Sequence, residues 1–212
     1  MEKWLKIPTR ILIFGFSLVT TGCALETGSS TCRLASYSIT PDSGQEVGIG
    51  HDSPANSRGR SVAQSFIPTE GKAVSATVQL KKVGSFTVGN ETLTATIENN
   101  TVSSGNNVPD NTPIATSSTV DPAIISSTLA LDYTFTFTSS VDLTSGQTYW
   151  LRIKGSYAVG TTNYITWLGH NGQTNGYSFG STFLNAVYET NTGSFSNSQI
   201  GSNRFLLFSI GC

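Results

Sequence analysis

The sequence predicts an all-β fold in which two antiparallel sheets pack as a β-sandwich of jelly-roll type. Three observations support this prediction. Short segments alternate between apolar and polar residues with a period of two. Turn-forming Gly, Asn and Ser lie between these segments. Helix-forming residues are sparse, whereas Thr, Ser, Gly and β-branched residues are abundant.

The first 22 residues have the layout of a secretory signal peptide. Three cationic residues precede the apolar run 11–19, and small residues follow up to Gly22. The apolar run is far shorter than the roughly 20 residues that a membrane-spanning helix needs. We therefore expect residues 1–22 to be removed on export.

Cys23 follows Gly22 directly and resembles the lipidated cysteine of bacterial lipoproteins, whose thiol takes a diacylglycerol and becomes the new N-terminus. This sequence departs from the family's pattern at Thr20, where Leu is favoured. Ordinary signal-peptidase cleavage near Gly22 or Ala24 is the alternative. Lipidation predicts that residues 23–31 are a flexible tether and that the membrane is a partner through the lipid. The protein would then belong to the cell envelope, at the outer membrane or the cell surface.

The cysteine count supports lipidation of Cys23. The chain has three Cys, and an odd count in an exported protein requires a role for the unpaired thiol. Lipidation of Cys23 leaves Cys32 and Cys212, which we expect to form a disulfide in an oxidising compartment. This bond would close nearly the whole mature chain into one loop and stabilise it by about 4 to 5 kcal/mol. It also requires the first and last strands to end close together; two free thiols are the alternative.

The mature chain has little charge. Without the leader, nine basic and twelve acidic side chains remain, a net charge of −3. No basic patch occurs, so nucleic acid is not an expected partner. No amphipathic helical segment suggests a second membrane contact. The remaining length suits one domain, which we assign to residues 32–212.

Eight strands are predicted within this domain, most of them alternating between apolar and polar residues. They cover residues 61–67, 74–80, 93–97, 131–137, 147–154, 164–168, 186–189 and 204–210. The strand 204–210 is apolar on both faces, so it should lie centrally or under a covering loop. The polar segments 99–113 and 169–180 are predicted to be long loops.

Four of these segments carry a family resemblance: AQSF at 63–66, the strand 74–80, LTSGQTYWLRIK at 143–154 and YITWLG at 164–169. They resemble the exported bacterial β-sandwich modules called choice-of-anchor proteins, which are similar to carbohydrate-binding jelly rolls. The resemblance covers residues 60–169, about half of the chain. It implies export, surface anchoring and a jelly-roll-like sandwich. It implies no catalytic residues and no particular ligand, because the group has no single established activity.

The residues give no catalytic or metal motif. The two histidines, His51 and His170, are far apart in Gly-rich loops, where solvated side chains are expected. No nucleophile-elbow sequence occurs, so we expect no enzyme, and a hydrolase with paired carboxylates is the last of the alternatives. Asp42, Asp52 and Asp132 are candidate ligands for a structural calcium ion. Ordinary turn aspartates are the alternative, and no other cofactor is expected.

One predicted strand carries a candidate ligand surface. Alternation over residues 147–154 places Trp150, Arg152 and Lys154 on one face. An aromatic ring beside two cations on a wet face can hold a sugar or an anionic glycan, because the ring stacks on the sugar and the charges meet hydroxyls or acids.

Three further residues are candidates near the predicted loop 169–180. Trp167 precedes this loop, His170 lies in it, and Tyr177 is close in sequence. The alternative is that both tryptophan rings, at 150 and 167, pack against the core.

These patterns leave two main functional hypotheses of different classes. The first is an envelope-attached binding module, possibly for extracellular glycan. The second is a protein-interaction or adhesion lipoprotein that contacts an extracellular protein through its loops and has no small-ligand pocket.

Overall fold

The computed structural model describes residues 32–37, 41, 45–53, 56–57, 61–171, 186–189, 194–196 and 204–212. The leader, the tether with Cys23, and the candidate residues Asp42 and Tyr177 lie outside the described residues. Within the described ranges the chain is built from β-strands and one short 3-10 helix, and no helix is long and apolar enough to cross a membrane.

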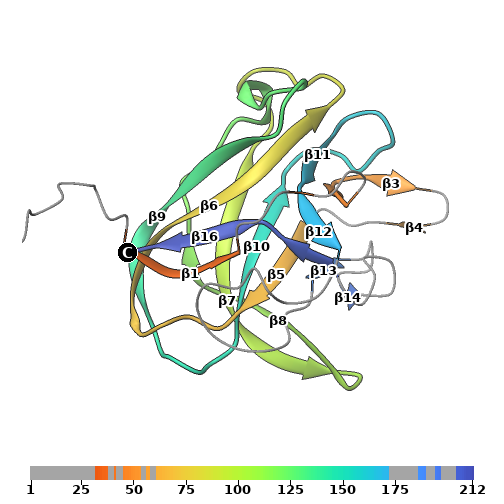
Figure 1. Cartoon of the computed structure of the whole chain (residues 1–212). Helices are drawn as coiled ribbons and strands as arrows, with labels where there is room; N and C mark the ends of the chain where they lie inside the picture. The colour runs from red at the N-terminus through yellow and green to blue at the C-terminus, as the bar shows by residue number, and fades with distance from the viewer. Residues whose placement is uncertain are drawn as a thin grey trace, which may run out of the picture. The chain divides into compact units, whose positions relative to one another are not determined.

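The elements follow one another as shown in Figure 1. In chain order they are β1 (Arg33–Tyr37), β2 (Val47–Ile49), β3 (Asp52–Ser53), β4 (Asn56–Ser57), β5 (Ser61–Phe66), β6 (Gly71–Val83), β7 (Leu93–Ser103), β8 (Asn106–Thr116), the helix η1 (Pro122–Ile124), β9 (Leu131–Leu143), β10 (Tyr149–Gly155), β11 (Tyr164–Trp167), β12 (Gly169–Asn171), β13 (Ala186–Glu189), β14 (Phe195–Ser196), β15 (Arg204–Leu206) and β16 (Phe208–Gly211).

The first large sheet is organised around the long strand β6. Strand β9 pairs antiparallel along one edge of β6, from Gly71 opposite Leu143 to Leu80 opposite Leu131. The other edge of β6 pairs first with β16 and then with β11. β1 continues the sheet beyond β16, and β2 continues it beyond β11. The predicted strand 204–210 thus becomes β15 and β16, and β16 lies between two neighbours.

The second large sheet has the order β14-β13-β5-β10-β7-β8, and every neighbouring pair is antiparallel. β10 is its central strand, with Leu151 opposite Gln64 of β5 on one side and Ile97 of β7 on the other. Two short pairs, β12 with β15 and β3 with β4, complete the described structure.

One apolar core fills the space between the two large sheets, as the predicted sandwich requires. Ala76, Val78 and Leu80 of β6 belong to it together with Leu151 and Ile153 of β10, and all five are buried. The structure is therefore a two-sheet antiparallel β-sandwich.

The alternation of β6 is broken at one position. Val74 is predicted on the same face as Ala76, yet it is 37% exposed, and Ala73 is buried instead. The pairing of β6 with β9 shifts its register between Ala73 and Ser75. Such a bulge reverses the side on which the neighbouring residues point. It explains why Ala73 is buried and Val74 is exposed.

The predicted loop 99–113 is wrong, because most of this segment forms the hairpin of β7 and β8. Its turn lies at Ser104 and Gly105, whose φ angles are 51° and 79°, as a two-residue hairpin turn with the twist of the sheet requires. The ends of both strands near this turn are exposed on both faces. Val108 and Pro109 beyond them are buried, but two adjacent buried residues give no apolar alternation that would mark the strands in the sequence.

The predicted disulfide between Cys32 and Cys212 is present, with the two Cα atoms 5.2 Å apart. Arg33 of β1 pairs with Gly211 of β16, and the Cys212 amide donates to the Cys32 carbonyl over 3.2 Å. The first and last described strands therefore end side by side, at the left of Figure 1.

A seam joins the two large sheets along one side. Ser117 forms an isolated bridge with Phe137, and the Ser118 amide donates to the Thr136 carbonyl over 2.9 Å. The Thr138 hydroxyl donates to the Thr116 carbonyl over 2.9 Å. These bonds connect the segment that ends β8 with the middle of β9, each of which borders its own sheet.

Candidate functional site: a polar groove around Arg152

The central strand β10 presents two different faces. Leu151 and Ile153 point into the main core, while Trp150, Arg152 and Lys154 share the opposite face, as the alternation predicts. On that face Arg152 lies opposite Thr96 of the neighbouring strand β7 and opposite Ala63 of the neighbouring strand β5.

Trp150 is fully buried on this outer face and does not lie on a wet surface. Its ring packs with Ala63, Val187 and the partly buried Phe195 in a second, small apolar cluster. Its Nε1 donates to Asn100 Oδ1 over 2.9 Å. The burial follows from β13, which pairs with β5 and brings Val187 opposite Ala63.

The guanidinium of Arg152 is fixed by four side-chain partners. Nε donates to Ser61 Oγ over 2.8 Å, and Nη2 donates to Glu189 Oε2 over 2.7 Å. Nη1 donates both to Glu98 Oε1 over 3.1 Å and to Asn111 Oδ1 over 2.9 Å. These partners come from β5, β13, β7 and β8, so one side chain on β10 links five strands of the sheet.

The two carboxylates and the guanidinium are removed from solvent. The Arg152 side chain is 8% exposed, that of Glu98 is 0% and that of Glu189 is 17%. Apolar side chains of similar volume usually stabilise a fold at least as well as such a buried ion network. Stability alone therefore does not account for these residue types, and buried ionisable clusters beside a pocket are candidates for a functional site.

The pKa of Glu189 shows how the network is balanced. Burial raises this pKa, but the hydrogen bond from Ser61, the charge and hydrogen bond of Arg152 and the charge of Lys154 together outweigh burial. The net effect lowers the pKa of Glu189 below its ordinary value, so its carboxylate is ionised at neutral pH.

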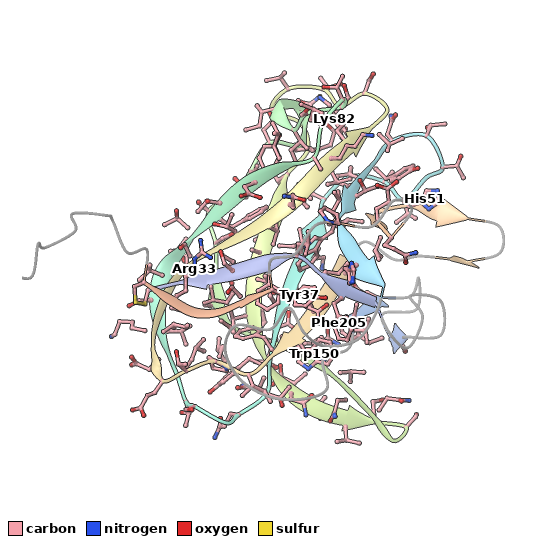
Figure 2. All side chains as sticks on the ribbon, viewed as in Figure 1. Arg33, Tyr37, His51, Lys82, Trp150 and Phe205 are labelled. Atoms are coloured by element: carbon pink, nitrogen blue, oxygen red, sulfur yellow. A yellow bond between two sulfur atoms is a disulfide. The ribbon has the colours of Figure 1, made fainter. Side chains whose placement is uncertain are left out.

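These residues border a pocket of about 360 Å³, which we call the Arg152 groove. Its lining consists of Thr94, Thr96, Glu98, Asn111, Pro113, Arg152, Lys154 and Glu189. Strands β7 and β10 supply most of these residues, β8 supplies Asn111 and Pro113, and β13 supplies Glu189. A smaller hollow of about 100 Å³ lies over the other sheet, beside Arg33 and Tyr37, both labelled in Figure 2.

The β8 side of the groove has irregular backbone. The pairing of β7 with β8 shifts register on both sides of Glu98, and bulges of this kind often re-aim side chains beside functional sites. Asn111 has a φ of 61°, a left-handed conformation that Asn tolerates better than most residues. This backbone brings Asn111 Oδ1 to Arg152.

Glu98 has one oxygen left over. Its Oε1 accepts from Thr96 Oγ1 over 2.9 Å and from Arg152. Its Oε2 is buried and has no hydrogen-bond partner among the described residues. Buried polar atoms in folded proteins are nearly always paired, so an unpaired carboxylate oxygen in the wall of a pocket indicates a missing donor.

The other candidate residues from the sequence lie elsewhere. Trp167 is fully buried in the main core, and its Nε1 donates to the Leu207 carbonyl over 2.8 Å. His170, half-buried in β12, pairs with Phe205 of β15. Both tryptophan rings are therefore packed inside the protein, as the alternative to a ligand-binding role predicted. Arg152 and Lys154 are the sequence candidates that the structure brings together at the groove.

Sequence reasoning missed four members of the network: Ser61, Glu98, Asn111 and Glu189. Glu98 had a usable signal, because the alternation that buries Leu93, Ala95 and Ile97 places it on the polar face of β7. Asn111 and Glu189 had none, because their positions depend on the bulged hairpin and on the pairing of β13 with β5.

The groove has no metal-like arrangement. Across the described ranges, no three His, Cys, Asp or Glu side chains gather where they could hold an ion. Asp132, a candidate calcium ligand, accepts from Gln79 Nε2 over 3.3 Å on an exposed face. In the groove a guanidinium lies between the carboxylates.

Comparisons with known proteins add no name to this geometry: no family model matches the chain, and no curated protein matches it.

Proposed function

We propose that this protein is an exported, lipid-anchored binding module that holds an extracellular glycan in the Arg152 groove. The observation that carries the proposal is a polar pocket of about 360 Å³ bordered by a guanidinium with four fixed partners. Ligand sites are concave and hold a few polar groups in set positions, and this groove has both properties.

The groove is suited to hydroxyl groups. Lys154, Thr94, Thr96 and Asn111 line it and are at least partly exposed, so their ammonium, hydroxyl and amide groups can meet a ligand. Arg152 holds Glu98 and Glu189 in place before any ligand arrives, and this preorganisation lowers the entropy lost on binding. Because Trp150 is buried, recognition here uses hydrogen bonds rather than stacking on an aromatic ring.

Attachment through Cys23 is supported by the cysteine pairing. Cys32 and Cys212 bond to each other, which leaves Cys23 as the remaining thiol of the three. A lipid on Cys23 would hold the domain at the outer membrane or cell surface. Metabolic labelling with radioactive palmitate tests this directly: wild type should be labelled and sediment with membranes, whereas Cys23→Ser should be unlabelled and released.

Binding rather than hydrolysis is favoured by the state of the two acids. A glycosidase needs one carboxyl that is still protonated near neutral pH and can act as general acid. The lowered pKa of Glu189 opposes that role, and Glu98 Oε1 accepts two hydrogen bonds from Thr96 and Arg152. Glu189 is therefore not suited to act as the general acid of such a pair.

The proposal is tested by a glycan and polysaccharide binding screen. The full chain, expressed with its leader and purified after export, is compared with Lys154→Gln and Thr94→Val. Lys72→Gln is the matched control, because Lys72 forms an exposed ion pair with Asp142 in the other sheet. We expect at least a tenfold loss of affinity in the groove variants and less than a twofold change in the control. The absence of binding across a broad panel contradicts the proposal.

A protein-contact role is the second candidate, and one observation favours it. Val88 and Leu129 are 77% and 65% exposed in loops, and Ile124 at the end of η1 is 66% exposed. These loops are linked, because the Gly89 amide donates to Asp121 Oδ2 and the Lys82 amide to the Ser126 carbonyl. Figure 2 marks this end of the molecule by Lys82. If Ile124→Ser abolished cell-surface crosslinks to an extracellular protein while the groove variants did not, this role would be preferred.

A further inference from the structure

The Arg152 groove is electrically balanced. Arg152 and Lys154 supply two positive charges, and Glu98 and Glu189 supply two negative ones. Two salt bridges of 3.1 and 2.7 Å join Arg152 to the acids. Among the eight lining residues the formal charges therefore cancel.

We propose that the Arg152 groove selects a neutral, hydroxyl-rich glycan and discriminates against polymers of uronic or sulfated sugars. This inference rests on the proposed glycan-binding function and specifies its ligand class.

Anionic ligands are disfavoured because the cation that would attract them is already engaged. Three of the Arg152 nitrogens donate to the protein, and two of the acceptors are carboxylates. An acidic group that approached Arg152 would come close to Glu98 and Glu189. Like charges that meet in a partly desolvated site repel, and proteins use such repulsion to reject wrong ligands.

Cationic ligands are disfavoured for the complementary reason. An ammonium group would find an acceptor in Glu98, but it would lie beside the charges of Arg152 and Lys154. Lys154 is close enough to Glu189 for its charge to act on that carboxyl. Both carboxylates are thus matched by a cation of the protein, which leaves no net negative charge to attract a second one.

A sugar hydroxyl matches the hydrogen-bonding groups of the groove that the network around Arg152 does not use. It donates one hydrogen bond and accepts others, whereas a carboxylate or sulfate only accepts. Glu98 Oε2 is an acceptor without a donor among the described residues, so a carboxylate or sulfate group placed beside it leaves it unpaired. A hydroxyl can donate to this carboxylate after a small rotation about its soft terminal torsion. Other hydroxyls of the same glycan can accept from the exposed ammonium of Lys154, which lies opposite Thr94 on the groove.

Matched polymers that differ only in charge test the inference. The full chain is titrated by calorimetry with dextran and carboxymethyl-dextran, and with esterified and de-esterified polygalacturonan, alongside xylan and mannan. We expect binding to at least one neutral polymer and at least tenfold weaker binding to the charged form within a pair. Tighter binding to the charged forms overturns the neutral preference but retains the glycan-binding function. Absence of binding to every polymer overturns both.

Charge variants separate the groove from the protein's overall charge. Glu189→Gln gives the groove one positive charge and should improve binding to the acidic polymer relative to the neutral one at least fivefold. Asp142→Asn makes the same change of net charge on β9, in the exposed pair with Lys72, and should leave the ratio unchanged. Equal shifts in both variants overturn the inference. Circular dichroism and thermal melting confirm that each variant is folded.

Discussion

Arg152 and Glu98 are diagonal neighbours rather than a direct cross-strand pair. In the register of β10 and β7, Arg152 lies opposite Thr96, and Glu98 lies opposite Trp150. The guanidinium reaches one pair along the sheet to place Nη1 3.1 Å from Glu98 Oε1. Diagonal contacts of this kind are within reach of long side chains on a pleated face. The contact keeps Arg152 beside the groove and over the ring of Phe195, 5.0 Å from its centroid.

Removal of the guanidinium should destabilise the fold strongly. Arg152→Met leaves the fully buried Glu98 without a counter-charge, and loss of one partner of a buried ion pair lowers the free energy of unfolding by about 3 to 5 kcal/mol. Urea unfolding measures the change. Lys154→Met, at the exposed neighbouring position, should change it by less than about 0.5 kcal/mol. The double variant Arg152→Met with Glu98→Met should recover much of the loss, and no recovery would contradict the ion-pair explanation.

Glu189 should make stability depend on pH in the acid range. Its pKa is lower in the folded protein than the ordinary value of 4.5. The stabilisation is therefore present above pH 4.5 and is lost as the pH falls through the folded pKa. Glu189→Gln should be less stable than wild type at pH 7 by about 1.5 to 3 kcal/mol, the contribution of a hydrogen bond to a charged group. The two unfolding curves should converge in acid; a constant difference down to pH 2 would contradict this.

Tyr157 should make stability depend on pH in the alkaline range. Burial raises the pKa of this tyrosine well above 10.0, and a backbone hydrogen bond opposes the shift only in part. Its hydroxyl donates to the Ile49 carbonyl over 2.7 Å. A raised folded pKa means that stability is fully present below pH 10 and declines as the pH rises above it. Thermal melts of wild type should fall above pH 10, and Tyr157→Phe should show a shallower decline from a lower starting point.

The disulfide should contribute a large part of the stability. Replacement of both Cys32 and Cys212 by Ser opens the loop that the disulfide closes between two residues separated by 180 positions. The chain-entropy relation for so long a loop gives a loss of about 5 kcal/mol. A reductant should lower the melting temperature of wild type to about that of the double variant. It should leave the melting temperature of the double variant unchanged. An effect of reductant on the double variant would point to another cause.

Much of the fold could be predicted from the sequence where one strand face is buried. The alternation of Leu93, Ala95 and Ile97 with Thr94 and Thr96 located β7, and similar patterns located β6 and β9. The strands β5 and β10 were also located, although both of their faces are largely buried. The short strands β1 and β2 were not predicted. The half of the β7–β8 hairpin nearest its turn was missed because most of its residues are exposed and polar, so no apolar alternation marks it.

The candidate site was predicted only in part, for a related reason. The period of β10 correctly placed Arg152 and Lys154 on the outer face. Whether Trp150 on that face meets water depends on Val187, which reaches it through a long-range pairing of β13 with β5. Local alternation gives the face of a residue but not what lies over it.

The bonds between Ser118 and Thr136 and between Thr138 and Thr116 have a consequence for self-association. Unpaired backbone groups at a sheet border are where foreign strands add and where aggregates begin. Along this stretch the end of β8, the residues that follow it and the middle of β9 form hydrogen bonds with each other. A second molecule that added a strand there would have to break native hydrogen bonds first, so this flank of the sandwich is protected against polymerisation by its own topology.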